Sequence, residues 1–239
     1  KIPEASDEGP LAFTSVTGGI SMAEFEVCQL EGMRWVQISI NDETVRAESG
    51  ALSYMMGEIQ MSARLPSIGS AVKSMMSHQA MVRPTYTGTG TIHLESSLNG
   101  YHLFDLDGES WSLEKGAYWA SDEGVQLGLY RERVWTSLRT GEGLIDYRTM
   151  VSGKGRVVLN APGPVEEITL DEERLVAEGS YVIARTAGID YRYRLPTTFM
   201  QSFISGEPRV RDYRGTGRAL VCWTPYWNEY IMRRMDSQE

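Results

Sequence analysis

Apolar and polar residues alternate with a period of two along much of this chain. Residues 25–30 read Phe-Glu-Val-Cys-Gln-Leu, and residues 35–40 read Trp-Val-Gln-Ile-Ser-Ile. Such alternation is typical of β-strands that bury one face of a sheet. Turn signals that contain glycine separate these runs, and no helical run alternates with them as it would in a parallel α/β fold. The pattern therefore predicts an all-β chain of short antiparallel strands.

Turn chemistry predicts where the strands end. Glu31-Gly32 and Asn99-Gly100 lie between apolar runs. Asn-Gly predicts a two-residue hairpin, because both central residues of a type I′ turn need a positive φ. Further strand ends are predicted from turn-forming pairs at Asn41-Asp42, Asp107-Gly108 and Asp171-Glu172.

Glycine positions show that the chain repeats itself. Nine of the 24 glycines fall into three sets at steps of 63 to 68 residues: Gly32, Gly50 and Gly57; Gly100, Gly116 and Gly124; Gly163, Gly179 and Gly188. A Gly-x-Gly landmark also recurs, at residues 88–90, 153–155 and 215–217. A fixed period above about 20 residues indicates a repeat architecture. We therefore expect three tandem β-sandwich repeats, arranged with pseudo-threefold symmetry in one compact domain.

The same landmarks set the expected boundaries. A flexible arm takes residues 1–17, and the repeats, each with an apolar linker, take residues 18–84, 85–147 and 148–212. Residues 213–239 supply a strand that closes the three units and a C-terminal tail. The linkers, residues 62–84, 128–147 and 194–213, break the alternation. We expect short helices or loops that cover sheet ends, with an exposed patch for a partner or a membrane as the alternative.

Charge and cysteine content narrow the function classes. The 239 residues carry a formal charge of −9 and a pI of about 5.0, which disfavours nucleic-acid partners. Cys28 and Cys222 lie in apolar runs without zinc-ligand spacing, so we expect reduced, buried thiols. No signal peptide or membrane-spanning run is visible. We expect a cytoplasmic protein, or a mitochondrial one if a targeting leader has been removed.

No catalytic, metal or cofactor site emerges. The Gly-x-Gly segments lack the third glycine of a dinucleotide fingerprint and open strands rather than helices. The histidines are His78, His93 and His102; if Asn99-Gly100 is a two-residue turn, His93 and His102 lie too far apart for one zinc ion. No Gly-x-Ser-x-Gly elbow occurs. Glu48 and Glu114 recur at one repeat position, which favours a turn-stabilising role.

Two Asp-Tyr-Arg segments are the best polar candidates. They comprise Asp146, Tyr147 and Arg148, and Asp212, Tyr213 and Arg214. We interpret them as ion pairs that join repeats, with a tyrosine in the core. The alternative is a recognition site between repeats.

The repeated segments resemble a known family. Residues 45–56, Val-Arg-Ala-Glu-Ser-Gly-Ala-Leu-Ser-Tyr-Met-Met, are similar to its recurring Ala-Glu-x-Gly-Ala-Met-x-Tyr-Met segment. Residues 86–90, 113–120 and 176–184 resemble its later copies. This is the mitochondrial-biogenesis family named for altered inheritance of mitochondria, member twenty-four, with bacterial and archaeal relatives. The resemblance covers about residues 18–223.

The resemblance implies mostly fold. Its members are similar to three fused units of the tryptophan RNA-binding attenuation protein (TRAP), an all-β, double-stranded-β-helix-like sandwich. Mitochondrial members are associated with inner-membrane organisation and respiratory complexes, and the family brings no catalytic residues. We therefore expect a non-enzymatic scaffold without a cofactor, which binds itself as a homo-oligomer or binds a protein partner, with peripheral association with a membrane surface. The alternatives are a TRAP-like RNA-binding module and a cupin-like small-molecule enzyme.

Overall fold

The computed structural model describes residues 23–63, 83–97, 99–134, 144–178, 181–194 and 210–223. These ranges contain twelve β-strands and no helix, and every strand pair is antiparallel. The strands are β1 (Glu24–Leu30), β2 (Met33–Ala47), β3 (Leu52–Ser62), β4 (Thr85–Leu94), β5 (Gly100–Leu113), β6 (Tyr118–Asp122), β7 (Val125–Val134), β8 (Leu144–Ala161), β9 (Val165–Glu178), β10 (Val182–Thr186), β11 (Ile189–Arg194) and β12 (Val210–Cys222). The all-β prediction is confirmed.

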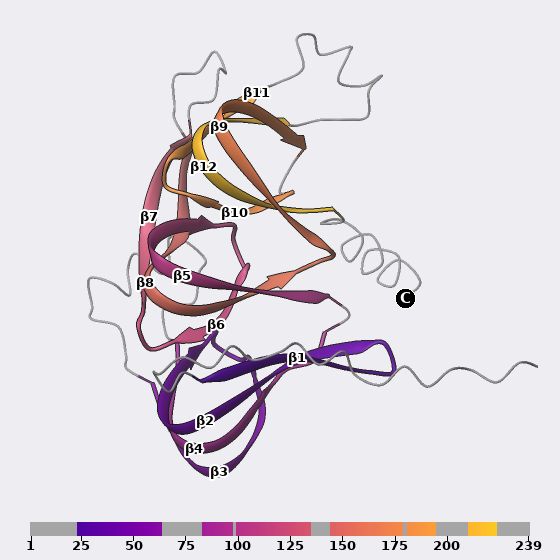
Figure 1. Ribbon diagram of the computed structural model, residues 1–239, viewed down its shortest axis with the longest axis vertical. Coiled ribbons are helices and arrows are strands. Elements are labelled where there is room, and N and C mark those ends of the chain that lie inside the picture. Colours follow the sequence, from indigo (N-terminus) through magenta and orange to yellow (C-terminus); the bar gives the residue numbers. More distant parts are fainter. Residues whose placement is uncertain are drawn as a thin grey trace, which may run out of the picture.

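All twelve strands belong to one open sheet. Its main path runs β11-β12-β10-β5-β8-β6-β2-β4-β3, and β1, β7 and β9 pair with β2, β8 and β12. Figure 1 shows the chain rising from β1–β4 at the bottom, through β5–β8, to β9–β12 at the top. Most of the apolar linkers, the N-terminal arm and the C-terminal tail lie outside the described residues, so the expectations about them stay predictions.

One pairing order occurs three times along the sheet. The strand that carries the Gly-x-Gly landmark lies between two earlier strands: β4 between β2 and β3, β8 between β5 and β7, and β12 between β9 and β11. We refer to β1–β4, β5–β8 and β9–β12 as the first, second and third units. Each landmark strand is thus the centre of its unit, although it comes last in the sequence.

The strands are longer than the sequence predicted, because the expected breaks are β-bulges. Asp42, Gly108 and Glu172 have φ values of 58°, 91° and 57°. The pairing register shifts next to each of them, but β2, β5 and β9 continue through. A bulge inserts a residue, bends the strand and increases its twist without ending it. The predicted strand ends at these positions are therefore wrong.

The two predicted turns had different outcomes. Glu31 and Gly32, with φ values of 50° and 82°, form the two-residue turn between β1 and β2. The hairpin at Asn99-Gly100 is wrong, because β4 and β5 do not pair. Gly100 instead begins β5 opposite Ala161 of β8.

Gly57 permits a close approach of two strands. It lies opposite Gly90 of β4, and a Cβ atom on Gly57 would lie 2.5 Å from the carbonyl oxygen of Thr89. Cβ atoms on Gly124 and Gly188 would likewise lie too close to the carbonyl oxygens of Lys154 and Thr216. Part of the glycine register thus reflects backbone contact with the central strand of each unit.

The expected closure of the three units by the C-terminal strand is wrong. β12 pairs with β9, β10 and β11, all within the third unit. Closure would need a pairing between the first and third units, and the sheet of the described residues has none.

The core consists of three apolar clusters, two of which cross unit boundaries. The cluster around Trp111 combines second-unit residues with Ile183, Leu220 and Cys222 of the third unit. The cluster around Ile38 includes Val158 of the second unit. Burial of these side chains joins neighbouring units, since removing apolar surface from water stabilises the fold. Cys222 is buried, Cys28 is half-buried, and both are free thiols.

Candidate functional site

Short strands join each later unit to the unit before it. β6 places residues 120–122 opposite residues 47–45 at the end of β2. β10 places residues 184–186 opposite residues 113–111 at the end of β5. Charged and aromatic side chains gather at both junctions, which makes the junctions the candidate sites.

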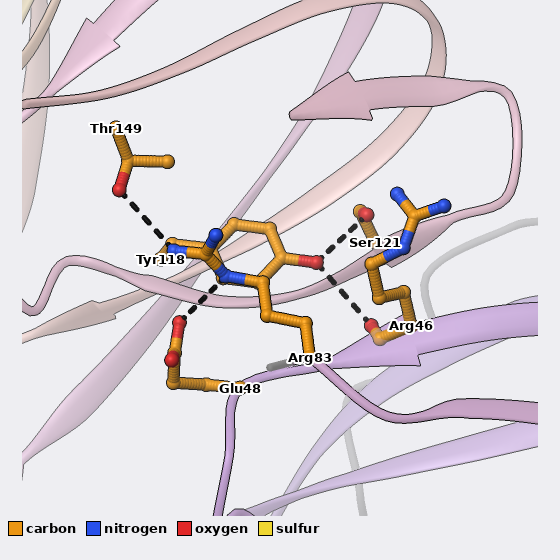
Figure 2. A network of polar contacts seen from close by, with 6 residues as sticks. All are labelled: Arg46, Glu48, Arg83, Tyr118, Ser121 and Thr149. Atoms are coloured by element: carbon orange, nitrogen blue, oxygen red, sulfur yellow. Dashed lines mark hydrogen bonds and ion pairs between the residues drawn. The ribbon is translucent and has the colours of Figure 1, made fainter. Parts of the chain in front are cut away.

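The first junction holds an ion pair against an aromatic ring (Figure 2). Arg83 Nε donates a hydrogen bond to Glu48 Oε2 at 2.9 Å, and its Nη2 donates to Thr149 Oγ1 at 3.3 Å. The Arg83 guanidinium also lies 4.8 Å from the ring centroid of Tyr118, a cation–π geometry. Residues of the first and second units are thereby held together.

Tyr118 itself is buried and tightly hydrogen-bonded. Its hydroxyl lies 2.9 Å from Ser121 Oγ and donates to the Arg46 carbonyl oxygen at 3.4 Å (Figure 2). Burial raises the pKa of Tyr118 to about 12, although the hydrogen bond with Ser121 opposes this rise. The phenol therefore stays protonated at neutral pH.

The second junction is built around Glu114. Arg148 Nη1 and Arg211 Nη1 donate to the same oxygen, Glu114 Oε2, at 2.6 Å and 2.5 Å. Arg148 Nη2 also donates to the Tyr191 hydroxyl at 3.1 Å. The guanidinium carbons of Arg148, Arg185 and Arg211 lie 5.2 to 5.3 Å from the centroid of the Tyr191 ring.

Burial and charge oppose each other at this second junction. Burial alone raises the pKa of Glu114, but the positive charges of Arg148 and Arg211 outweigh burial, so the pKa is lowered. Burial alone lowers the pKa of Arg148, and the Glu114 charge outweighs that effect and raises it. All three groups are ionised at neutral pH, which suits a fixed ion-pair network better than proton transfer.

The structure separates the two Asp-Tyr-Arg segments. Arg148 is buried at the junction, whereas the Arg214 side chain is 63% exposed and its Nε donates to Asp212 at 3.4 Å. Asp212 also accepts a hydrogen bond from Arg174 at 3.0 Å. Tyr213 is buried, with its ring 5.4 Å from that of Tyr191. The side chains of Asp146 and Tyr147 lie outside the described residues.

Sequence reasoning missed most residues of the junctions, among them Arg83, Tyr118, Tyr191 and Arg211. Usable signals existed for two of these four. Arg83 and Arg148 each stand five residues before the first glycine of a Gly-x-Gly landmark, Gly88 and Gly153. Tyr118 stands two residues after Gly116, as Tyr181 does after Gly179. No comparable spacing marks Tyr191.

A hollow of about 740 Å³ lies beside the first junction. Its lining includes Thr44, Arg46, Arg83, Thr87 and Gln126. The lining also includes Glu123, so the hollow offers both hydrogen-bond donors and acceptors, which suits a polar molecule better than an apolar one.

Metal-ligating groups do not gather in the described ranges, where no three His, Cys, Asp or Glu side chains could hold one ion. His93 instead stacks on Tyr54, with ring centroids 4.2 Å apart. Burial lowers the pKa of His102, against the opposing effect of Glu167. His78 lies outside the described residues. The same ranges contain no helix of the length and apolarity needed to cross a bilayer.

Comparison with known proteins gives three findings. The profile of the family described as mitochondrial biogenesis AIM24 matches residues 25–222. An uncharacterised protein of Streptococcus pyogenes serotype M6 is 25% identical over 189 residues, covering 74% of this chain and 76% of that protein. A crystal structure of a Streptococcus pyogenes protein superposes with a TM-score of 0.66 at 23% identity, covering 91% of this chain and 100% of the other. This last likeness concerns the fold.

Proposed function

Because the chain belongs to the mitochondrial biogenesis AIM24 family, we propose that it is a non-enzymatic scaffold protein that assembles with itself and supports membrane-associated complexes. Respiratory complexes are the partners that the family resemblance favours. Fold alone does not define function, so the proposal depends on particular surfaces of this chain.

We further infer that the three units are tandem copies of one TRAP-like unit. The support is the construction that they share: each has a long strand with a bulge, namely β2, β5 or β9, and a central Gly-x-Gly strand. A short strand at a junction occurs in the second and third units. A chain of three linked units forms an extended sheet with many surface positions for partners.

The observation that carries the proposal is the concentration of exposed apolar side chains at one end of the sheet. Six of the eight exposed large apolar residues among those described belong to β1 and β3: Val27, Leu30, Tyr54, Met55, Met56 and Met61. The two strands are separated by β2 and β4, so these side chains lie on two separate strands of the first unit. Exposed apolar surface favours binding to other proteins or to membranes. The first unit is therefore the proposed docking end.

The junction networks support a structural role for the buried charges. Glu48 binds Arg83, and Glu114 binds Arg148 and Arg211. Arg211 joins the third unit to Glu114 of the second, and Arg83 reaches Thr149 of the second unit. These contacts hold neighbouring units against each other, and a rigid arrangement of units suits a scaffold.

Native electrophoresis of detergent-solubilised membranes tests the proposal. Tagged wild-type chain is expressed in cells that lack their own copy, and we expect it to co-migrate with subunits of a membrane complex. The double substitution Leu30→Ser and Met61→Ser should abolish co-migration, because it removes two exposed apolar contacts at the docking end. The matched control is Lys154→Ala, whose side chain is 78% exposed on the second unit.

Two results would contradict the proposal. One is a wild-type chain that never migrates with any membrane complex. The other is a purified chain that turns over a small molecule at the hollow beside Arg83, with turnover lost in Arg83→Ala.

A further inference from the structure

The two junctions follow one pairing rule. In each, the last residues of the long, bulged strand of one unit pair antiparallel with the short strand of the next unit. These pairs are β2 with β6 and β5 with β10. Ala47 lies opposite Ala120, and Leu113 lies opposite Ala184. One residue further on, the Glu48 amide donates to the Trp119 carbonyl oxygen at 2.7 Å, and the Glu114 amide donates to that of Ile183 at 2.8 Å. A unit can therefore pair through two different edges: the end of its long, bulged strand, which pairs with the next unit, and the strand that pairs with the unit before it.

A recurring irregularity identifies the same edge in the first unit. The short strands β6 and β10 shift register against their central strands between Tyr118 and Ala120 and between Val182 and Ala184. β3 shifts register against β4 in the same way, between Leu52 and Tyr54. Residues 54–56 are therefore the first-unit counterparts of residues 120–122 and 184–186.

The other edge is found in the third unit by the same reasoning. Val45 and Trp111 each lie opposite the residue two places before the first landmark glycine. Leu175 of β9 occupies that position in the third unit, opposite Tyr213. Residues 175–177 are therefore the counterparts of residues 45–47 and 111–113.

The two counterpart edges, residues 54–56 and residues 175–177, include exposed side chains, whereas the corresponding residues of a formed junction are buried. Tyr54, Met55 and Met56 are 51%, 37% and 64% exposed, and Val176 is 45% exposed. Ala120 and Ser121, at the formed junction, are 0% exposed. β3 pairs only with β4, and β9 only with β12, among the described strands. The free edge of a strand presents unpaired backbone N–H and C=O groups that can pair with another chain.

The open sheet determines which molecule can join these edges. Figure 1 shows β3 at the bottom and the β9–β11 region at the top of the long axis, with the second unit between them. The two edges of one chain do not meet, but the edges of two chains can. The partner that fits each edge best is therefore a second copy of this chain, because the rule already operates twice within it.

We propose that copies of this chain assemble head to tail, with residues 175–177 of one copy pairing antiparallel with residues 54–56 of the next. The register follows from the formed junctions: Leu175 opposite Met56, Val176 opposite Met55, and Ala177 opposite Tyr54. The Glu178 amide then donates to the Ser53 carbonyl oxygen. This inference deepens the proposed self-assembly and rests on that proposed function.

The intermolecular junction is weaker than the two internal ones. Val210 occupies the position of Arg83 and Arg148, five residues before the landmark glycine Gly215. The arginine that binds the junction glutamate from within the same unit is thus replaced by an apolar residue. The assembly is therefore reversible and depends on concentration. Head-to-tail contacts form rings if the rotation closes and filaments if it does not.

Disulfide trapping tests the register directly. In a Cys28→Ser, Cys222→Ala background, one protein carries Ala177→Cys and another carries Tyr54→Cys. These two positions form the non-hydrogen-bonded pair, with Cα atoms about 4.5 Å apart, within the range for a disulfide. We expect a disulfide-linked dimer on non-reducing gels from the mixture and from neither protein alone. A dimer from Tyr54→Cys alone would show β3–β3 pairing and would overturn the proposal.

Sedimentation of the otherwise unmodified chain gives the second readout. Mass should rise with concentration for the wild type and for Gln60→Lys, because Gln60 is exposed on β3 outside the paired segment. It should stay at the monomer value for Met55→Lys and for Val176→Lys. Two outcomes would overturn the edge pairing but leave the self-assembling scaffold intact. In one, the wild type assembles but the cysteine variants form no disulfide-linked dimer. In the other, Met55→Lys assembles as well as the wild type does. A wild type that is monomeric at every concentration overturns both self-assembly and this junction.

Discussion

The guanidinium of Arg148 lies 2.6 Å from the carboxylate of Glu114, and both side chains are largely withdrawn from water, at 4% and 13% exposure. Neither charge would be stable there alone, since an ion that leaves water loses several kcal/mol of solvation. The pair connects the turn after β5 with β8, and Arg211 extends it to the third unit. Its removal should therefore loosen one junction without changing the strand order.

Arg148→Ala should lower the free energy of unfolding by about 3 kcal/mol, because it leaves a buried carboxylate with one arginine partner in place of two. Chemical denaturation monitored by tryptophan fluorescence measures this change. Arg214→Ala is the control, since that exposed arginine forms a surface ion pair worth about 0–1 kcal/mol. Equal losses for the two variants would contradict the assignment of Arg148 to the junction.

Stability should fall in acid partly through Glu114. Its pKa in the folded chain is below the ordinary value of 4.5, so the unfolded chain binds this proton more readily. The stabilisation is complete above pH 4.5 and is lost as the pH falls through the folded pKa. The stability difference between wild type and Glu114→Gln should therefore narrow below pH 4.5, as urea titrations at several pH values would show. A difference that does not vary with pH would count against it.

Gly57→Ala should lower the free energy of unfolding by about 2–3 kcal/mol, because the new Cβ meets the Thr89 carbonyl oxygen and φ is 109°. Gly128→Ala is the matched control. Gly128 lies in β7 with no atom within 4 Å of the added carbon, so a change within about 1 kcal/mol is expected. Thermal denaturation of both variants measures the contrast, and similar melting temperatures would refute the close approach of β3 and β4.

The bulge in β9 offers a stabilising substitution. Glu172 has a φ of 57°, and a non-glycine residue in the left-handed region costs about 1–2 kcal/mol. Glu172→Gly should raise stability by about 0.5–1 kcal/mol after the entropic cost of glycine. The second unit already has glycine at this position, Gly108. The neighbouring substitution Glu173→Gly should instead lower stability by a similar amount. Calorimetry measures the melting temperatures of both variants. If both variants melt below the wild type, the assignment of the bulge to Glu172 is wrong.

Sequence patterns predicted the strand class because it depends on local chemistry. Alternation at residues 35–40 reflects a one-sided core, and Glu31-Gly32 adopts the turn that its φ values require. The strand end predicted at Asp42 was wrong for a physical reason. A residue that adopts a positive φ is suited to a turn and to a bulge alike. Only the partner strand decides between them.

The junction residues were hidden for a different reason. Arg211 and Arg148 bind one carboxylate, but they stand at different distances from their landmark glycines, four and five residues. Aligning the two Asp-Tyr-Arg segments therefore matched Arg148 with Arg214, which faces solvent. Glu48 and Glu114 recur at one repeat position, but such recurrence in a single sequence does not show which units are in contact. The open sheet was missed for the same reason, since landmark order does not reveal which edges meet.

The position of each central strand has a consequence for synthesis. β4, β8 and β12 are the last strands of their units to leave the ribosome, yet each lies between two strands made earlier. Until the central strand has been made, the two strands that flank it have no shared partner. Their backbone N–H and C=O groups can then pair with the wrong strand. The order of synthesis therefore leaves β2 and β3 without their shared partner until β4 has been made.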